Sequence, residues 1–382
     1  MTTRFTIDGS EELEQRLEAT CERVRAGVLR EIPPRSVAAL VLGGGYGRGQ
    51  GGVLRTPAGD HPYNDMEFYL FLRGNRLWNE RKYRHPLAAL ADELSPEAGL
   101  HIEFKIESLE RFRRAPVSMF SYDLVSGHRV IIGSAGAMAG CSRHLAAEQI
   151  PLSEGTRLLF NRCTGLLLAE RMLRQATWGD EQADFVGRNL AKAWMALGDA
   201  VLTAAGQYHW SCLERRQRLQ TLALDGPPPG LAAIKLMHSQ GVDFKLHPRK
   251  ATNPREEFNA EHRRTVTMAL RLWLWLESRR LNRPFATVEE YAASDIDKCP
   301  ETSRWRNYLL NLKTFGWSSV FAPNAGRYPR ERLLCSLPLL LARSEARVDP
   351  EVRQRLQRNL QTAATDWQGL SHSYQQLWPA LG

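Results

Sequence analysis

The chain has little cysteine and no long apolar run. Its 382 residues include six cysteines, which are scattered and form no C-x-x-C pair. This pattern argues against a zinc ribbon and a disulfide framework and fits a reducing cytosol. No stretch approaches the roughly 20 apolar residues of a membrane span. The N-terminal "MTTRFTIDGSEELEQRLEAT" lacks the apolar core of a secretory signal. We therefore expect a cytoplasmic protein without a membrane partner.

A dense block of basic residues is also missing. The formal net charge is +9, which suits polyanionic partners such as nucleotides or nucleic acid. However, the Lys and Arg residues are spread along the chain, and no known nucleic-acid motif is present. Aromatic and basic residues do not interleave as they do in an RNA-binding sheet. Nucleic acid is thus a possible partner that the sequence does not favour, and the sequence indicates no oligomeric state.

The length suits two packed domains rather than one. Strands are predicted where short apolar or alternating runs occur, and helices where apolar residues recur every three to four positions. The expected strands are 36–42, 66–72, 101–109 and 129–133, and the expected helices in this part are 10–31 and 86–94. After about residue 150 the chain is strongly helical. We predict an α+β protein, with a small mixed-sheet domain over 1–145 and a larger all-helical domain over 146–382.

A glycine cluster follows the first predicted strand, in "LVLGGGYGRGQGG". Backbone N–H groups can approach an anion closely where no Cβ intervenes, so phosphate binding is the natural hypothesis. A P-loop is excluded because no Lys-Ser/Thr pair follows. A dinucleotide fingerprint can be traced through Gly47, Gly49 and Gly52, but it requires a helix where residues 53–62 read as a loop. The landmarks of a protein kinase are missing downstream.

The stretch "GGYGRGQ" at residues 44–50 resembles the G-S-x-A-R-G-E turn of the nucleotidyltransferase superfamily, which includes DNA polymerase β and the antibiotic nucleotidyltransferases. In that family a D-x-[DE] pair follows on the second strand, and a third carboxylate lies on a later strand. The matching residues here are Asp65, Glu67 and Glu103. The resemblance covers about residues 36–135.

This sequence departs from the family turn at three positions. Gly45 stands for the usual Ser, Gly47 for the Ala, and Gln50 for the Glu. The backbone N–H groups are unaffected by the first change, and two carboxylates remain on the second strand. The loss of the Glu charge at position 50 has no explanation in the sequence.

The resemblance implies transfer of a nucleotidyl group from ATP or another NTP to an unknown acceptor. Two Mg²⁺ ions about 4 Å apart would neutralise the charge that develops on the phosphates. Asp65 and Glu67 would hold both ions, because side chains at i and i+2 of a strand share a face. Glu103 would bind the catalytic metal or accept the proton of the attacking hydroxyl. All three are therefore expected to be both catalytic residues and metal ligands.

The resemblance also implies contacts to the nucleotide. Gly44 and Gly45 would cradle its phosphates and Arg48 would add a charged contact. Lys192 is the expected triphosphate lysine of the helical domain, which would close the cleft for nucleotide and acceptor, and Tyr208 would line the same groove. Small-molecule or protein acceptors are favoured by the size of the chain and its helical second domain.

Several alternatives stay open. Glu103 can instead be an exposed edge carboxylate paired with Lys105, and Lys192 can be a solvated helix residue. Trp273 and Trp275 do not share one helical stripe, so one of them is expected to face away from the core. The protein can also be a catalytically weak nucleotidyltransferase fold that senses a nucleotide or binds a partner.

Overall fold

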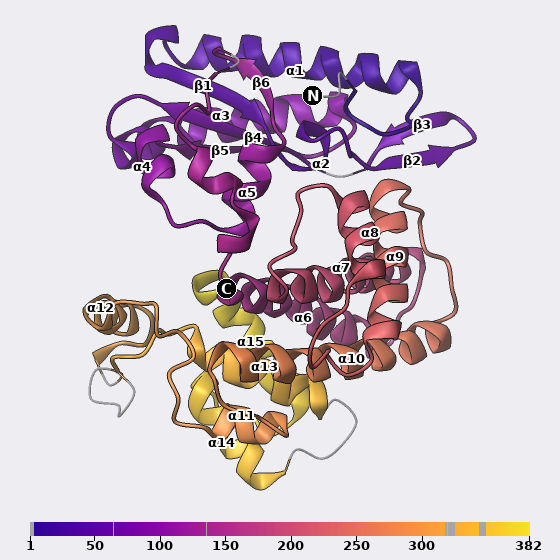
Figure 1. Ribbon diagram of the computed structural model, residues 1–382, viewed down its shortest axis with the longest axis vertical. Helices are drawn as coiled ribbons and strands as arrows, with labels where there is room; N and C mark the ends of the chain where they lie inside the picture. Colours follow the sequence, from indigo (N-terminus) through magenta and orange to yellow (C-terminus); the bar gives the residue numbers. More distant parts are fainter. Residues whose placement is uncertain (1–3, 64, 135, 318, 320–324, 344–348) are drawn as a thin grey trace. The chain divides into compact units, whose positions relative to one another are not determined.

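The computed structural model describes residues 4–382 except 64, 135, 318, 320–324 and 344–348 (Figure 1). It is a mixed α+β structure that divides into two compact units. The first unit comprises Met1–Glu154, Leu202–Leu222 and Ser239–Arg249, and the second comprises Gly155–Val201, Ala223–His238 and Lys250–Gly382. The sequence predicted one boundary after residue 145. The structure places two later segments with the first unit as well, and Ser211, Cys212 and Lys245 of these segments contact its glycine turn, as described below.

The first unit contains a four-stranded mixed sheet in the order β5-β4-β1-β6. Its strands are β1 (Val37–Leu42), β4 (Met66–Leu72), β5 (Ile102–Glu107) and β6 (Arg129–Ile132). β1 pairs antiparallel with β4 and β6, and β4 pairs parallel with β5. All four strands lie within or at the ends of the predicted runs. β4 is buried on both faces, as its continuous apolar sequence predicts.

The two faces of the sheet are covered by different helices. α1 (Glu11–Glu31) and α3 (Arg76–Ala98) pack on one face, in a core that includes Val24, Leu90, Phe68 and Leu70 (Figure 1). α4 (Leu109–Arg114) and α5 (Met119–Ser126) lie on the other face, which buries Tyr69 and Phe71 from β4. The short helices α2 (Gly44–Gly47), η1 (Pro34–Ser36), η2 (Ser142–Leu145) and η3 (Ala147–Gln149) join these elements.

One local prediction is too short and another is wrong. The short helix expected at 86–94 is the middle of α3, which begins after the N-cap Asn75 and continues through Pro86. The proline removes one helical hydrogen bond, but Tyr83, Leu87 and Leu90 are buried on the sheet and hold both halves of the helix there. The expected loop at 53–62 is a hairpin of β2 (Val53–Thr56) and β3 (Gly59–Pro62). Because a hairpin is not a helix either, the dinucleotide fingerprint remains excluded.

The second unit is helical in the part that the structure describes. Its helices are most of α6 (Leu152–Leu173) and α7 (Asp180–Ala204), part of α9 (Leu231–Leu246), and α10 (Arg255–Arg280), α11 (Val288–Ala293), α12 (Arg304–Phe315), α13 (Glu331–Ala342), α14 (Pro350–Leu360) and α15 (Trp367–Leu381). α8 (Cys212–Thr221) belongs to the first unit.

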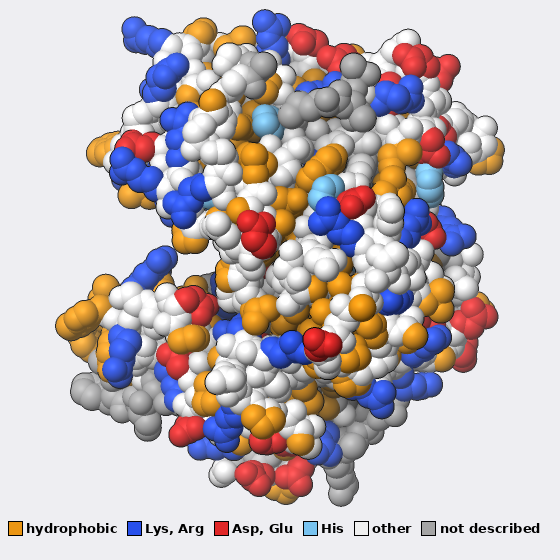
Figure 2. Space-filling model, viewed as in Figure 1, with side chains coloured by type: hydrophobic (Ala, Val, Ile, Leu, Met, Phe, Trp, Pro, Cys, Tyr) orange, Lys and Arg blue, Asp and Glu red, His pale blue; other side chains and the backbone are white. Residues whose placement is uncertain are grey.

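None of the helices described is both long and apolar enough to span a bilayer. Figure 2 shows Lys and Arg side chains spread among acidic and apolar ones over the face in view.

One helix of the second unit, α12, buries polar residues and exposes large apolar ones. On α12 the buried residues are Asn307 and Asn311, whereas Trp305 and Leu309 are 80% and 64% exposed. Asn311 Nδ2 donates to the carbonyl oxygens of Asn307, Ala325 and Arg327 at 3.0, 3.0 and 2.8 Å. The asparagines are buried because they satisfy backbone acceptors that an apolar side chain would leave unpaired.

Candidate functional site

The glycine turn directly follows β1, and Gly44 and Gly47 are among the positions at which it requires glycine. Gly44 begins α2 with φ +62°, a conformation that L-residues with side chains rarely adopt. At Gly47 a Cβ would lie 2.1 Å from the carbonyl oxygen of Leu42, so this backbone excludes the alanine that the nucleotidyltransferase turn has at this position. The turn closes through hydrogen bonds from Gly47 N to Gly43 O and from Gln50 N to Gly45 O, of 2.9 and 2.8 Å.

Two of the three predicted carboxylates face each other. Glu67 on β4 and Glu103 on β5 are register partners in the parallel ladder, so their side chains lie on the same face of the sheet. The Lys105 ammonium lies near both, with Nζ 3.1 Å from Glu103 Oε2 and 3.5 Å from Glu67 Oε2. Glu103 thus pairs with Lys105, as in the alternative that the sequence left open, and the same cation is shared with Glu67.

Glu67 also connects this pair to the glycine turn. Its carbonyl oxygen accepts a 2.9 Å hydrogen bond from Gly43 N, and its carboxylate lies 3.7–3.8 Å from where a Cβ on Gly44 would be. The Tyr69 hydroxyl donates to Glu67 Oε2 at 2.6 Å. Burial and the neighbouring Glu67 carboxylate raise the pKa of Tyr69 well above its ordinary value, so the phenol remains a donor.

Asp65 lies one residue before β4 and is exposed. Among the described residues no three His, Cys, Asp or Glu side chains are placed so that they could hold one metal ion, so Asp65 does not complete a ligand cluster with Glu67 and Glu103. The structure therefore brings together the Glu67–Glu103 pair and the glycine turn. The role of Asp65 as a ligand stays a prediction.

Arg48 is engaged within the protein. Its guanidinium forms an ion pair with Asp123 on α5, with Nη1 and Oδ2 3.2 Å apart, and only 11% of its side chain is exposed. Tyr208, which is also buried, lies 3.3 Å from the same carboxylate through its hydroxyl. Arg215 Nη1 lies 3.4 Å from that hydroxyl. Arg48 and Tyr208 thus meet through Asp123, whose part in this network no sequence pattern indicates.

Gln50, whose presence in the turn the sequence did not explain, anchors the turn to α8. Its amide donates to Ser211 Oγ at 2.6 Å and accepts from Cys212 N at 3.0 Å, so a buried side chain has both a donor and an acceptor satisfied. The half-buried Lys245 donates to the Gln50 carbonyl oxygen at 3.0 Å. Desolvation lowers the pKa of the Lys245 ammonium to about 8.

Lys192 lies on α7 in the second unit, where its side chain is exposed. Its assignment to the triphosphate stays a prediction. No family model matches this chain, and no curated protein resembles it closely enough to count as a match.

Proposed function

We propose that the first unit is a Mg²⁺-dependent nucleotidyltransferase, which transfers an NMP from ATP or another NTP to a hydroxyl or phosphate of a small-molecule or protein acceptor. One observation carries the proposal. Glu67 and Glu103 face each other in register and share one cation, and Glu67 lies against the first glycine of a tight turn after β1. A cation-binding carboxylate pair beside closely approachable backbone is what a metal–triphosphate substrate requires.

The chemistry of the donor set fits magnesium in part. Mg²⁺ takes hard oxygen ligands and is commonly held by one or two carboxylates plus substrate phosphates and waters. Glu67 and Glu103 supply two carboxylates, and the Lys105 ammonium between them shows that the position is favourable for a positive charge. Glu67 and Glu103 would hold the metal, and Asp65 stays a predicted further ligand. When bound, Mg²⁺ supplies neutralisation of the charge that develops on the phosphates.

Residues of this chain would bind the phosphates, accept the proton of the acceptor hydroxyl and orient Glu67. Gly44 and Gly45 are the first residues of α2, where backbone N–H groups have no acceptor within the helix and are available to phosphate oxygens. Glu103 is 46% exposed, so an acceptor hydroxyl can reach it, and its carboxylate would take the hydroxyl proton. The hydroxyl oxygen then bonds to the α-phosphorus while the bond to pyrophosphate breaks. Tyr69 orients Glu67 through its 2.6 Å hydrogen bond.

The test is labelling by α-³²P-NTPs. The purified chain is incubated with each labelled NTP, MgCl₂ and a desalted cell extract, and labelled products are separated. We expect a labelled acceptor with one NTP, and loss of at least about 100-fold in Glu67→Gln and Asp65→Asn. Glu110→Gln is the matched control, because Glu110 is 73% exposed and pairs only with Arg114 among the interactions described. Equal labelling by Glu67→Gln and the wild-type chain would refute the proposal.

A second candidate is a nucleotide-binding module without turnover. The observation that favours it is Lys105, which already neutralises part of the Glu67–Glu103 charge and so competes with a metal ion. In this case Mg-ATP would bind, as measured by calorimetry, while no NTP would label any acceptor in the extract. Turnover with any NTP would exclude this second candidate.

A further inference from the structure

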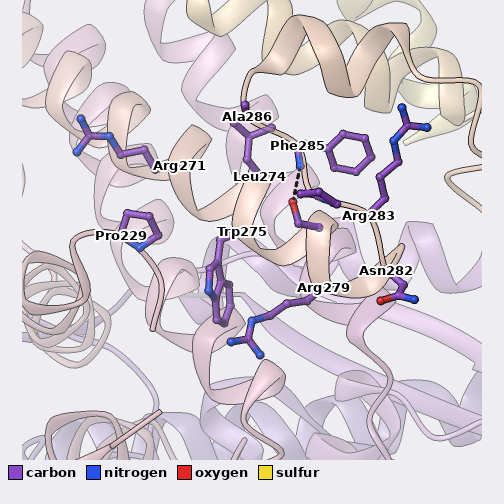
Figure 3. A pocket seen from close by; sticks show the side chains of 11 residues that line it. Pro229, Arg271, Leu274, Trp275, Arg279, Asn282, Arg283, Phe285 and Ala286 are labelled. Atoms are coloured by element: carbon purple, nitrogen blue, oxygen red, sulfur yellow. Dashed lines mark hydrogen bonds between the residues drawn. The ribbon is translucent and has the colours of Figure 1, made fainter. Parts of the chain in front are cut away.

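The second unit contains a groove of about 650 Å³ at the C-terminal end of α10 (Figure 3). Its lining includes Arg271, Arg279 and Arg283, two aromatic residues, Trp275 and Phe285, and no Asp or Glu. Figure 3 shows Arg271 and Arg283 toward opposite sides of the view, with Trp275 and Arg279 between them. The groove therefore combines positive charge with flat apolar surface.

The helix itself interleaves these residues. Arg271, Trp275 and Arg279 are spaced at i, i+4 and i+8 on α10 and so lie along one stripe. The sequence shows no strand on which aromatic and basic residues alternate, as they do in an RNA-binding sheet. On the helix α10, however, the same two residue types alternate along one side. Trp275 is half-buried whereas Trp273 is 1% exposed, which confirms that only one of these two tryptophans belongs to the core.

Trp275 and Arg279 contact each other and are held in place by hydrogen bonds, so the Trp275 ring has a fixed orientation on which a base can stack. The Arg279 guanidinium lies 4.5 Å from the centre of the Trp275 ring. Both are fixed by the same loop, because Trp275 Nε1 and Arg279 Nη2 donate to Gly226 O at 3.1 and 2.7 Å. An aromatic ring whose orientation is already fixed loses little entropy when a base stacks on it.

The other two arginines are accessible to a ligand. Arg271 is exposed and has no hydrogen bond or ion pair among the described residues. Arg283 has a 3.7 Å contact to Asp295, whose side chain is 95% exposed, and such a pair contributes little. Its guanidinium also lies 5.9 Å from the centre of the Phe285 ring, which lines the same groove. The guanidinium groups of this groove thus offer donors to an incoming anion.

We propose that this groove binds a single strand of nucleic acid, with one base stacked on Trp275 and backbone phosphates on Arg271 and Arg279. The spacing favours a strand over a free nucleotide: the two arginines arise about 12 Å apart along the helix axis, with Arg283 beyond them. A nucleotide carries its phosphates at one end, whereas a strand presents one at every residue. An acidic peptide would match the charge but would not use the ring. This proposal is independent of nucleotidyl transfer.

The test is fluorescence anisotropy of labelled 12-mers of oligo(U) and oligo(dT) against the full chain, from 50 to 200 mM KCl. We expect salt-dependent binding, weakened about three- to tenfold by Arg271→Ala, with a decrease of about 0.7 in the salt slope. Trp275→Ala should weaken binding at least about fivefold, and Trp275→Phe, which keeps a ring, by less. Arg306→Ala is the control: it removes another exposed arginine of the same unit, on α12, and should leave binding unchanged.

Three results would overturn the proposal. The wild-type chain could fail to bind either 12-mer at 50 mM KCl, or Arg271→Ala and Trp275→Ala could bind as tightly as the Arg306→Ala control. Competition supplies the third. If UMP or polyglutamate displaces the 12-mer as effectively per molecule as unlabelled oligo(U), the groove recognises a nucleotide or an acidic peptide instead. Circular dichroism of each variant verifies that a loss of binding does not reflect unfolding.

Discussion

Replacing Lys105 by methionine tests whether the Glu67–Glu103 pair is a cation site. Lys105 Nζ lies 3.1 and 3.5 Å from the two carboxylates, and the three side chains are 34–46% exposed. Exposed pairs of this kind contribute about 0.2–1 kcal/mol each. In Lys105→Met the two carboxylates remain opposite each other in the ladder and repel. We expect the free energy of unfolding to fall by about 1 kcal/mol.

Magnesium should reverse this loss. A site with a dissociation constant of about 1 mM gains roughly 1.4 kcal/mol in 10 mM Mg²⁺, enough to restore wild-type stability. The wild-type chain should gain less, because its own ammonium competes for the same oxygens. Urea unfolding in 10 mM MgCl₂ and in KCl of equal ionic strength measures both effects. Lys82→Met, which removes an exposed lysine of α3, is the control. If all three proteins respond to Mg²⁺ equally, the pair is not a cation site.

Three further predictions concern buried polar contacts. Asn311→Ala should lower the free energy of unfolding by about 2 kcal/mol, since three backbone carbonyls lose a donor, and an unchanged urea midpoint would contradict this account of α12. Gln50→Leu should cost a similar amount, about 2 kcal/mol, because Ser211 and Cys212 N lose their partner; urea unfolding that matches the wild type would show that the anchor is dispensable. Desolvation lowers the pKa of Lys245 from 10.5 to about 8, so between these pH values the unfolded chain binds more protons at this site than the folded chain. The stability difference between wild type and Lys245→Met should therefore rise with pH over that window, by up to about 3 kcal/mol, and a flat difference from pH 7 to 11 would refute this shift.

The strands and the first helix of the small unit were predictable from local patterns. β4 is a continuous apolar run and β5 alternates, so their places and buried faces follow from the residue period alone. The alternation on β5 also puts Glu103 and Lys105 on one face, so the sequence allowed their pairing as an alternative to a catalytic role for Glu103. The extent of α3 was not, because Pro86 reads locally as a helix start while tertiary burial carries the helix past it.

The surroundings of the glycine turn could not be predicted in the same way. Arg48 was expected to face a phosphate, but in the structure its guanidinium is paired with Asp123, which lies 75 residues further along the chain. Gln50 donates a hydrogen bond to Ser211, which lies 161 residues further along the chain. Such contacts depend on how distant segments pack, and no local spacing encodes them. It was likewise not predictable that Trp275, rather than Trp273, is the more exposed tryptophan of α10.

The discontinuous make-up of the first unit has a consequence for its synthesis. When residue 154 has left the ribosome, all four strands of the sheet have been synthesised. Ser211, which bonds to Gln50, and Tyr208, which bonds to Asp123, have not yet been translated. The last of these contacts needs Lys245. The glycine turn of the nascent sheet therefore lacks these contacts while about 90 more residues are translated over several seconds.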